Sequence, residues 1–187
     1  MTLRIGIIGA GRIAQLAHIH NLSTASGCRI VAIADLRIEL ARRVAQAFNI
    51  ERVFDHHTKL LQCADIDAVY IVTHRHATTS IAMHAINAGK HTFIEKPMAF
   101  NYEAAAALVS SADEQNVTFA VGYMKRHDPC VNLARELVRG MSDQYNLGQV
   151  QQYHFYCYGG DENREDKYIM TSESRPNDVP FQNIAPD

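Results

Sequence analysis

The sequence predicts an α/β fold in which helices cover both faces of a parallel sheet. Three observations predict it. Short apolar runs of strand length alternate with segments of helical period, glycines mark several of the junctions, and the alternation continues from the N-terminus to Gly122. Parallel strands need long crossover connections, which intervening helices supply. The chain of 187 residues is long enough for one well-buried domain and a small addition.

Six segments have the character of strands. Most are short continuous apolar runs, as expected for strands that are buried on both faces of a sheet. The segments between these strands contain polar residues, glycines or apolar residues at helical spacing. The predicted strands are residues 3–8, 29–34, 53–54, 68–72, 91–94 and 118–121.

Helices are predicted from apolar side chains at helical spacing. Ile13, Leu16, Ile19 and Leu22 define the first helix, and Leu40, Val44 and Phe48 define the second. A third helix is expected over residues 81–88, ended by Gly89, with Lys90 beside its negative C-terminal end. The alanine-rich segment 103–115 predicts a fourth, with Asn101 as its N-cap. The adjacent histidines at 56–57 are expected to lie in a loop.

The pattern changes after Gly122, so we place a domain boundary there, between residues 1–122 and 123–187. Val131, Ala134 and Leu137 predict one more helix, which is expected to end at Gly140. Residues 149–158 alternate polar and aromatic side chains and predict a half-exposed strand. From residue 159 onward the chain is polar, and we expect loop or disordered tail. The second segment is therefore a short α+β piece.

Composition argues against several classes of function. The net charge of −2 gives no basic patch for nucleic acid, and no apolar run is long enough to cross a membrane. Four widely spaced cysteines favour reduced thiols in a cytoplasmic protein over a disulfide framework. The ten histidines are not combined with cysteines or carboxylates at familiar ligand spacing, so no metal site is predicted.

A glycine-rich turn between the first strand and the first helix predicts a dinucleotide site of the Rossmann type. The first glycine permits the tight turn, and the second lets the backbone approach a pyrophosphate. The small residue at the end of the motif lets the helix pack close to the sheet, and the helix N-terminus attracts the phosphates. The motif consists of Gly9, Ala10, Gly11, Arg12, Ile13 and Ala14.

Asp35, at the end of the second predicted strand, is the expected partner of an adenosine ribose. A carboxylate there favours NAD and repels the 2′-phosphate of NADP, and the neighbouring Arg37 softens that preference, so NADP binding stays open. The alternative is a Rossmann-like domain whose glycine turn binds another nucleotide or none.

Further motifs resemble one oxidoreductase family. Residues 88–91 read AGKH, residues 95–99 read EKPMA and residues 122–126 read GYMKR. Together with the glycine turn, and in this order, they are similar to the Gfo/Idh/MocA family, which includes glucose–fructose oxidoreductase and inositol dehydrogenase. The resemblance extends over about residues 3–158.

This resemblance implies hydride transfer between NAD(P) and a hydroxyl or ketone carbon of a sugar or cyclitol. It implies that Lys96 is catalytic and lies near both nicotinamide and substrate, where an ammonium can stabilise alkoxide charge or relay a proton. By the same resemblance Glu95 helps to position the nicotinamide ribose. Thr73 and His74 border the cofactor, and Arg126 begins the substrate side of the cleft.

The chain also departs from the family pattern. His74 stands where the family has a proline, and the downstream acid-and-histidine motif of the second domain has no counterpart. The chain therefore resembles a truncated member that keeps the start of the substrate and oligomerisation domain. The lone strand predicted at residues 149–158 needs cover from another segment, a second copy or a complementing chain. A rival hypothesis is a non-catalytic dinucleotide-binding module or degenerate remnant.

Overall fold

The protein is described by a computed structural model that covers residues 2–144 together with 152, 154 and 170. The chain divides into two compact units, which are described separately: residues 1–122 together with Met170 belong to the first, and the second lies within residues 123–167. The first unit contains one six-stranded sheet in the order β3-β2-β1-β4-β5-β6, and every neighbouring pair of strands is parallel. The strands are β1 (Leu3–Ile8), β2 (Cys28–Ala34), β3 (Arg52–Phe54), β4 (Ala68–Ile71), β5 (His91–Ile94) and β6 (Phe119–Val121).

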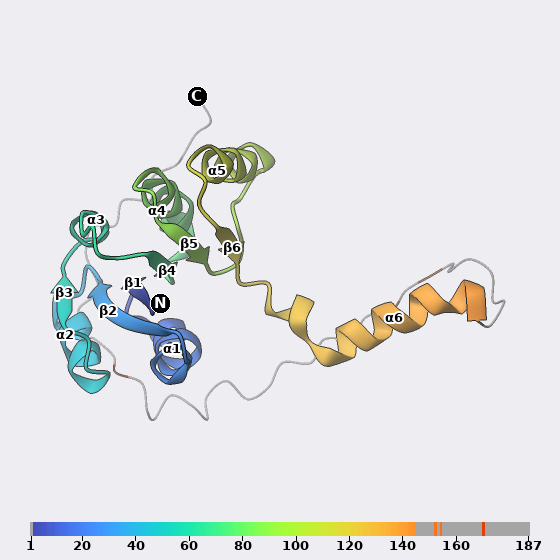
Figure 1. The fold of residues 1–187 in the computed structure, drawn as a ribbon, viewed down its shortest axis with the longest axis horizontal. Coiled ribbons are helices and arrows are strands. Elements are labelled where there is room, and N and C mark those ends of the chain that lie inside the picture. The colour runs from blue at the N-terminus through green and yellow to red at the C-terminus, as the bar shows by residue number, and fades with distance from the viewer. Residues whose placement is uncertain (1, 145–151, 153, 155–169, 171–187) are drawn as a thin grey trace. The chain divides into compact units, whose positions relative to one another are not determined.

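Helices cover both faces of this sheet (Figure 1). One face carries η1 (Ala14–Ile19), which is a π-helix, together with α1 (His20–Thr24) and α2 (Ile38–Ala47). The other face carries α3 (His57–Leu61), α4 (Arg75–Asn87) and α5 (Tyr102–Glu114). The predicted Rossmann-type doubly wound sheet is therefore confirmed. Its strand order reverses direction between β1 and β4, and ligands of open α/β sheets bind at such a point.

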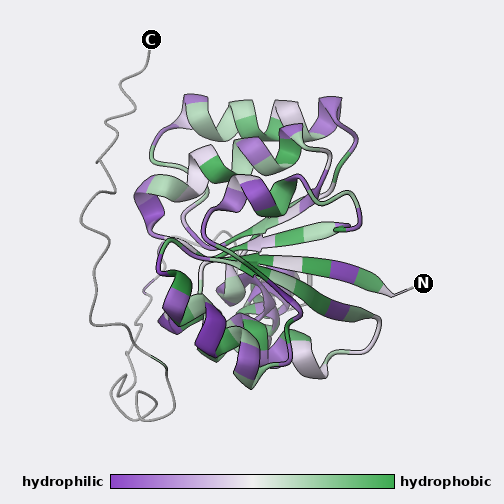
Figure 2. Ribbon diagram, turned by 90° about the vertical axis from the view of Figure 1, so that its left-hand side faces the viewer, coloured by the Kyte–Doolittle hydropathy of each residue, from purple (hydrophilic) through white to green (hydrophobic). Residues whose placement is uncertain are grey.

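Two apolar clusters, one on each side of the sheet, form the core. Ile7 and Ile33 pack with Leu40 of α2 on one side, whereas Ile71 and Leu108 belong to the cluster on the other side. All five side chains are fully buried. Apolar residues line the interior between the strands and both helical layers (Figure 2). Burial on both faces explains why the strands have continuous apolar runs instead of alternating ones.

Hydrogen bonds and an ion pair stabilise the edge of the sheet at which the strands begin. Arg4 donates two side-chain hydrogen bonds to the Asp67 carboxylate, at 3.1 and 2.7 Å, and its backbone N–H donates a third at 2.8 Å. These bonds hold the pKa of Asp67 at about 2. Lys90 is buried, and its Nζ donates to the carbonyls of Cys63 and Ile66. The Lys90 ammonium, expected beside the C-terminal end of α4, instead binds the segment between α3 and β4.

Six strand predictions are confirmed to within one residue at each end, and the helices predicted in the first unit are present, but the predicted start of α4 and the loop predicted at residues 56–57 were wrong. α4 begins at Arg75, six residues before the predicted start, because its polar first turns give no apolar periodicity. The loop predicted at residues 56–57 contains the start of α3, whose N-cap His56 accepts a hydrogen bond from Thr58 N. The N-cap prediction for Asn101 is confirmed: its side chain accepts from Ala104 N at 2.8 Å.

The described part of the second unit contains a short 3-10 helix, η2 (Met124–His127), and a longer helix, α6 (Pro129–Gln144). Asp128 caps the start of α6, because its side chain accepts a hydrogen bond from Cys130 N at 3.0 Å. The predicted end at Gly140 was wrong, since the helix continues to Gln144. The strand predicted at 149–158 and the tail lie outside the described residues, except that residues 152 and 154 are in neither a helix nor a strand.

In the part of the chain that the structure describes, none of the helices has the length and apolar character needed to cross a membrane.

A histidine pair between α3 and α4 couples the stability of the first unit to pH. His57 Nε2 and His84 Nδ1 share a hydrogen bond of 3.1 Å, and the two rings stack with an interplanar angle of 9°. Burial, and then repulsion from His56 and His84, lowers the pKa of His57 from 6.5 to about 4. A proton on His57 therefore costs more in the folded chain than in the unfolded chain.

We expect the free energy of unfolding to fall as the pH drops. Because the folded-state pKa of His57 lies below the unfolded value of 6.5, the loss begins as the pH falls below 6.5 and is complete near pH 4. Water screens the half-buried ring, so we expect a loss of about 1 kcal/mol between about pH 7.5 and about pH 5. Urea unfolding at these two pH values measures it.

The variant His57→Phe keeps an aromatic ring but cannot take up a proton, so its stability should fall less over this range than that of the wild type. The matched control is His20→Phe, at an exposed histidine of α1, which should behave like the wild type. Equal losses in the wild type and His57→Phe would show that His57 does not cause the dependence.

Candidate dinucleotide site

The glycine turn lies at the point where the strand order reverses. β1 ends at Ile8, and Gly9 follows with a φ of +105°, a conformation that side chains other than glycine rarely adopt. A Cβ on Gly9 would stand 2.2 Å from the carbonyl oxygen of Val72, just after β4. Gly9 N also donates to Ala34 O at 2.7 Å. The tight turn expected from the sequence is thus required by packing against both neighbouring strands.

Gly11 leaves its backbone open. The nearest atom that a Cβ there would meet is Arg37 Nη2, at 3.7 Å, an ordinary contact distance. The fold therefore has room for alanine at this position. In Rossmann domains a glycine here leaves space for a ligand phosphate to approach the backbone. Arg12 and Ile13 begin the helix after the turn, and the Ile13 side chain is partly exposed. These residues fit a pyrophosphate at the helix N-terminus.

Asp35 connects the end of β2 to the glycine turn. One carboxylate oxygen accepts the N–H of Ala10 at 2.8 Å, and the other accepts the N–H of Arg37 at 2.8 Å. The Arg37 guanidinium also pairs with both oxygens, at 3.0 and 3.1 Å. A carboxylate accepts about four hydrogen bonds. The chain therefore already uses the acceptor sites of the predicted ribose partner, so a ribose hydroxyl can bind Asp35 only where the Arg37 guanidinium moves away from it.

Gln15 is a buried polar residue that the sequence analysis did not single out. Its Nε2 donates to Ala10 O at 2.9 Å and to Met170 O at 2.9 Å, and its Oε1 accepts from Met170 N at 3.0 Å. Gln15 thus stabilises the glycine turn from the side of the helix and binds one residue of the C-terminal segment. Nothing in the local sequence predicts a contact between residues 155 positions apart.

Thr73 and His74 lie between β4 and α4, beside the glycine turn. Thr73 Oγ1 is 3.2 Å from Thr78 Oγ1, and Thr78 Oγ1 donates to His74 O at 3.3 Å. His74 is the N-cap residue of α4, and its ring stacks on that of His76 at 5.0 Å. Both predicted cofactor residues therefore lie at the carboxyl edge of the sheet. Their contact with a cofactor remains a prediction.

Glu95 and Lys96 follow β5 at the same edge. Glu95 Oε1 accepts a hydrogen bond from His18 Nε2 at 2.8 Å, and Oε2 accepts the N–H of Lys96 at 3.1 Å. Lys96 is exposed, and the peptide bond between Lys96 and Pro97 is cis. No sequence motif predicts the pairing of His18 with Glu95, because the two residues are 77 positions apart.

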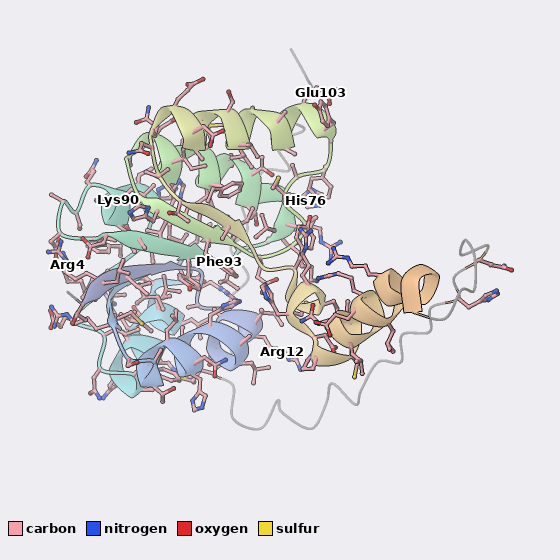
Figure 3. All side chains as sticks on the ribbon, turned by 45° about the vertical axis from the view of Figure 1, so that its right-hand side comes forward. Arg4, Arg12, His76, Lys90, Phe93 and Glu103 are labelled. Carbon is pink, nitrogen blue, oxygen red and sulfur yellow. The ribbon has the colours of Figure 1, made fainter. Side chains whose placement is uncertain are left out.

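The predicted cofactor residues of the first unit lie at one edge of the sheet. The Arg4–Asp67 ion pair lies at the opposite edge. Arg12 and His76 lie at the first of these edges, whereas Arg4 and Lys90 lie at the second (Figure 3). Arg126 belongs to η2 of the second unit, where its N–H donates to Tyr123 O at 2.9 Å, so its role toward a substrate remains a prediction. Among the described residues no group of three His, Cys, Asp or Glu side chains is placed to hold a metal ion.

This sheet order, with a glycine turn at its reversal point and an acid after β2, defines a dinucleotide-binding domain of the Rossmann type. The family model described as "Oxidoreductase family, NAD-binding Rossmann fold" matches residues 3–123. The chain belongs to this family, Gfo/Idh/MocA, and the resemblance inferred from its motifs is confirmed.

Several relatives agree with this assignment. An inositol 2-dehydrogenase/D-chiro-inositol 3-dehydrogenase from Lacticaseibacillus casei is 32% identical over 139 residues, which are 73% of this chain and 40% of the relative. YrbE, an uncharacterized oxidoreductase from Bacillus subtilis (strain 168), is 34% identical over 124 residues, which are 66% of this chain and 36% of the relative. The chain thus spans well under half the length of these two relatives.

Solved structures show the same fold. Scyllo-inositol dehydrogenase from Lactobacillus casei, with bound NAD(H) and scyllo-inositol, is 30% identical with a TM-score of 0.71, and the match covers 77% of this chain and 43% of that one. A 3-ketoreductase from Actinomadura kijaniata, in complex with NADP and TDP-benzene, is 27% identical with a TM-score of 0.70, and the match covers 74% and 42%.

Proposed function

We propose that this chain binds a nicotinamide dinucleotide and serves hydride transfer to or from a secondary alcohol or ketone carbon of a sugar or cyclitol. The observation that carries the proposal is the convergence of the Gly9–Gly11 turn, Asp35 and the Glu95–Lys96 segment at one edge of the sheet, on both sides of the β1/β4 reversal. The inositol named for two of the relatives supports the cyclitol part of this substrate class.

Different residues of the site would bind different parts of the cofactor. Gly11 and the start of the following helix would hold the pyrophosphate, and Asp35 would accept the adenosine ribose hydroxyls. Glu95 would accept a hydrogen bond from a hydroxyl of the nicotinamide ribose. Its carboxylate has acceptor positions that His18 and the Lys96 N–H do not use. Thr73 and His74 would border the same pocket.

Lys96 is the proposed catalytic residue. NAD supplies the acceptor for the hydride that leaves an alcohol carbon during oxidation. The alcohol oxygen must lose its proton in the same reaction, and the Lys96 side chain, exposed just after β5, would relay that proton to solvent or stabilise the alkoxide charge. Arg126 is proposed to contact the substrate. The cytoplasmic location, a second copy and a complementing chain remain predictions.

The test is titration of the purified chain with NADH and NADPH, monitored by nicotinamide fluorescence. We expect both to bind and NADH to bind more tightly, because Asp35 repels a 2′-phosphate while Arg37 offsets part of that repulsion. Compared with the wild type, Arg37→Ala should bind NADPH about tenfold more weakly and NADH with unchanged affinity. Failure of the wild type to bind either nucleotide would overturn the proposed function.

Turnover separates the two functional hypotheses. Oxidation of inositols or aldoses that is lost in Lys96→Ala, with NADH affinity retained, supports the oxidoreductase. Tight NADH binding without turnover of any such substrate supports the non-catalytic dinucleotide-binding module instead.

A further inference from the structure

A π-helical turn lies shortly after the glycine turn. Its residue His18 lies against the edge of the sheet where β5 ends. η1 spans Ala14–Ile19, and its side chain His18 is largely buried, with 11% of it exposed. π-helical turns are rare, and many occur at functional sites, because the wider turn redirects a side chain. In this chain the redirected side chain is His18, and it faces the end of β5.

Aromatic rings from two strands hold the His18 imidazole in place. Its ring centroid lies 5.3 Å from that of Phe93 on β5 and 5.8 Å from that of Tyr70 on β4. Phe93 and Tyr70 in turn stack on each other at 4.6 Å with an interplanar angle of 21°. The imidazole therefore has one packed orientation, in which its Nε2 is directed at Glu95.

The Glu95 carboxylate connects this histidine to the catalytic segment. It is 17% exposed, accepts from His18 Nε2 at 2.8 Å, and accepts from the Lys96 N–H at 3.1 Å. A hydrogen bond to a charged carboxylate in a partly buried site is stronger than one between neutral groups. Glu95 N also donates to Ile71 O at 3.1 Å, which fixes the backbone at the same point.

We propose that His18 is a positioning residue that holds the Glu95 carboxylate in the orientation needed to bind the nicotinamide half of the cofactor. This inference rests on the proposed function. His18 belongs to the phosphate-binding helix and Glu95 to the segment that carries Lys96, so their bond sets the alignment of the two halves of the cofactor site.

The proposal separates the two halves of the dinucleotide, and this makes it testable. ADP carries the adenosine and the two phosphates but lacks the nicotinamide ribose, so it reports on the glycine turn and Asp35 alone. NADH reports on both halves. A variant that merely disturbs the helix should weaken both ligands, whereas loss of positioning at Glu95 should weaken NADH selectively.

The experiment compares wild type, His18→Leu and His18→Gln by titration with NADH and with ADP. In His18→Leu we expect affinity for NADH to fall about tenfold and affinity for ADP to change less than about twofold. His18→Gln places a donor at a similar reach and should recover most of the NADH affinity. Glu95→Gln should lose NADH affinity similarly, and adding His18→Leu to it should cause little further loss.

A spectroscopic measurement tests the bond without any ligand. The ring nitrogens of His18, observed by ¹⁵N NMR, should report a hydrogen-bonded Nε2–H in the wild type and a shifted signal in Glu95→Gln. Equal weakening of NADH and ADP by His18→Leu, unchanged NADH affinity in that variant, or an unchanged His18 spectrum would overturn the inference. Failure of the wild type to bind both ligands would instead overturn the proposed function, and the cofactor role of His18 with it.

Discussion

Replacement of Gly9 by alanine is expected to unfold most of the purified chain. The new Cβ would stand 2.2 Å from Val72 O and 2.8 Å from Val72 C, and these backbone atoms cannot withdraw because Val72 N donates to Ile8 O at 2.8 Å. The φ of +105° adds backbone strain. Strain and overpacking together cost about 3–6 kcal/mol, which is comparable to the whole stability of a small domain. Circular dichroism and urea unfolding measure the loss.

Two other glycines provide matched controls. Gly27 has a φ of +87° and nothing within 4 Å of a Cβ, so Gly27→Ala should cost only the backbone term of about 1 kcal/mol. Gly11→Ala should fold like the wild type but bind NADH at least about tenfold more weakly, because its Cβ enters the space assigned to the pyrophosphate. A Gly9→Ala chain as stable as the wild type would contradict the packing argument at the β1/β4 reversal.

The second large effect is expected at Lys90. Its ammonium is buried and donates to Cys63 O at 2.9 Å and Ile66 O at 2.8 Å, so it joins the start of β5 to the segment before β4. Lys90→Met keeps most of the side-chain volume but removes the ammonium from the Ile66 carbonyl and leaves the Cys63 carbonyl only the Ile66 N–H, at 3.3 Å. We expect the free energy of unfolding to fall by about 2–4 kcal/mol. Urea unfolding near neutral pH measures it.

The control for this variant is Lys59→Met on α3. Lys59 also forms an ion pair, with Asp55 at 2.8 Å, but both side chains are more than half exposed. Such surface pairs contribute about 0–1 kcal/mol, so Lys59→Met should have little effect. If the two methionine variants lost equal stability, the buried carbonyl contacts of Lys90 would not be the cause.

The fold was predictable because its signals are local. β1 was predicted with both ends correct, since a short run dominated by leucine and isoleucine and followed by glycine indicates a buried strand and a turn within a few residues. α4 was predicted only in its second half, because the residues at its start are polar or β-branched and lack helical periodicity. There the tertiary structure decides: Thr78 is buried and bonded to Thr73, against the local preference.

The candidate site was predictable in its residue types and not in its connections. Gly9, Asp35 and Glu95 were identified from motifs, and the structure places all three at one edge of the sheet. The sharing of Asp35 with Arg37 was anticipated only as a charge effect, since sequence does not show the direction of a side chain. The structure shows that the guanidinium binds both carboxylate oxygens.

The alternation of strands and helices, the glycine turn and the family could all be inferred from the amino-acid sequence. Those features depend on hydrophobic periodicity and backbone freedom over a few neighbouring residues. Only the tertiary structure decided that His18 binds Glu95, that Lys90 binds Cys63 and Ile66, and that a Cβ on Gly9 would meet Val72. These contacts join residues that the strand order brings together across the sheet, and no local pattern carries information about a partner 24 to 77 positions away.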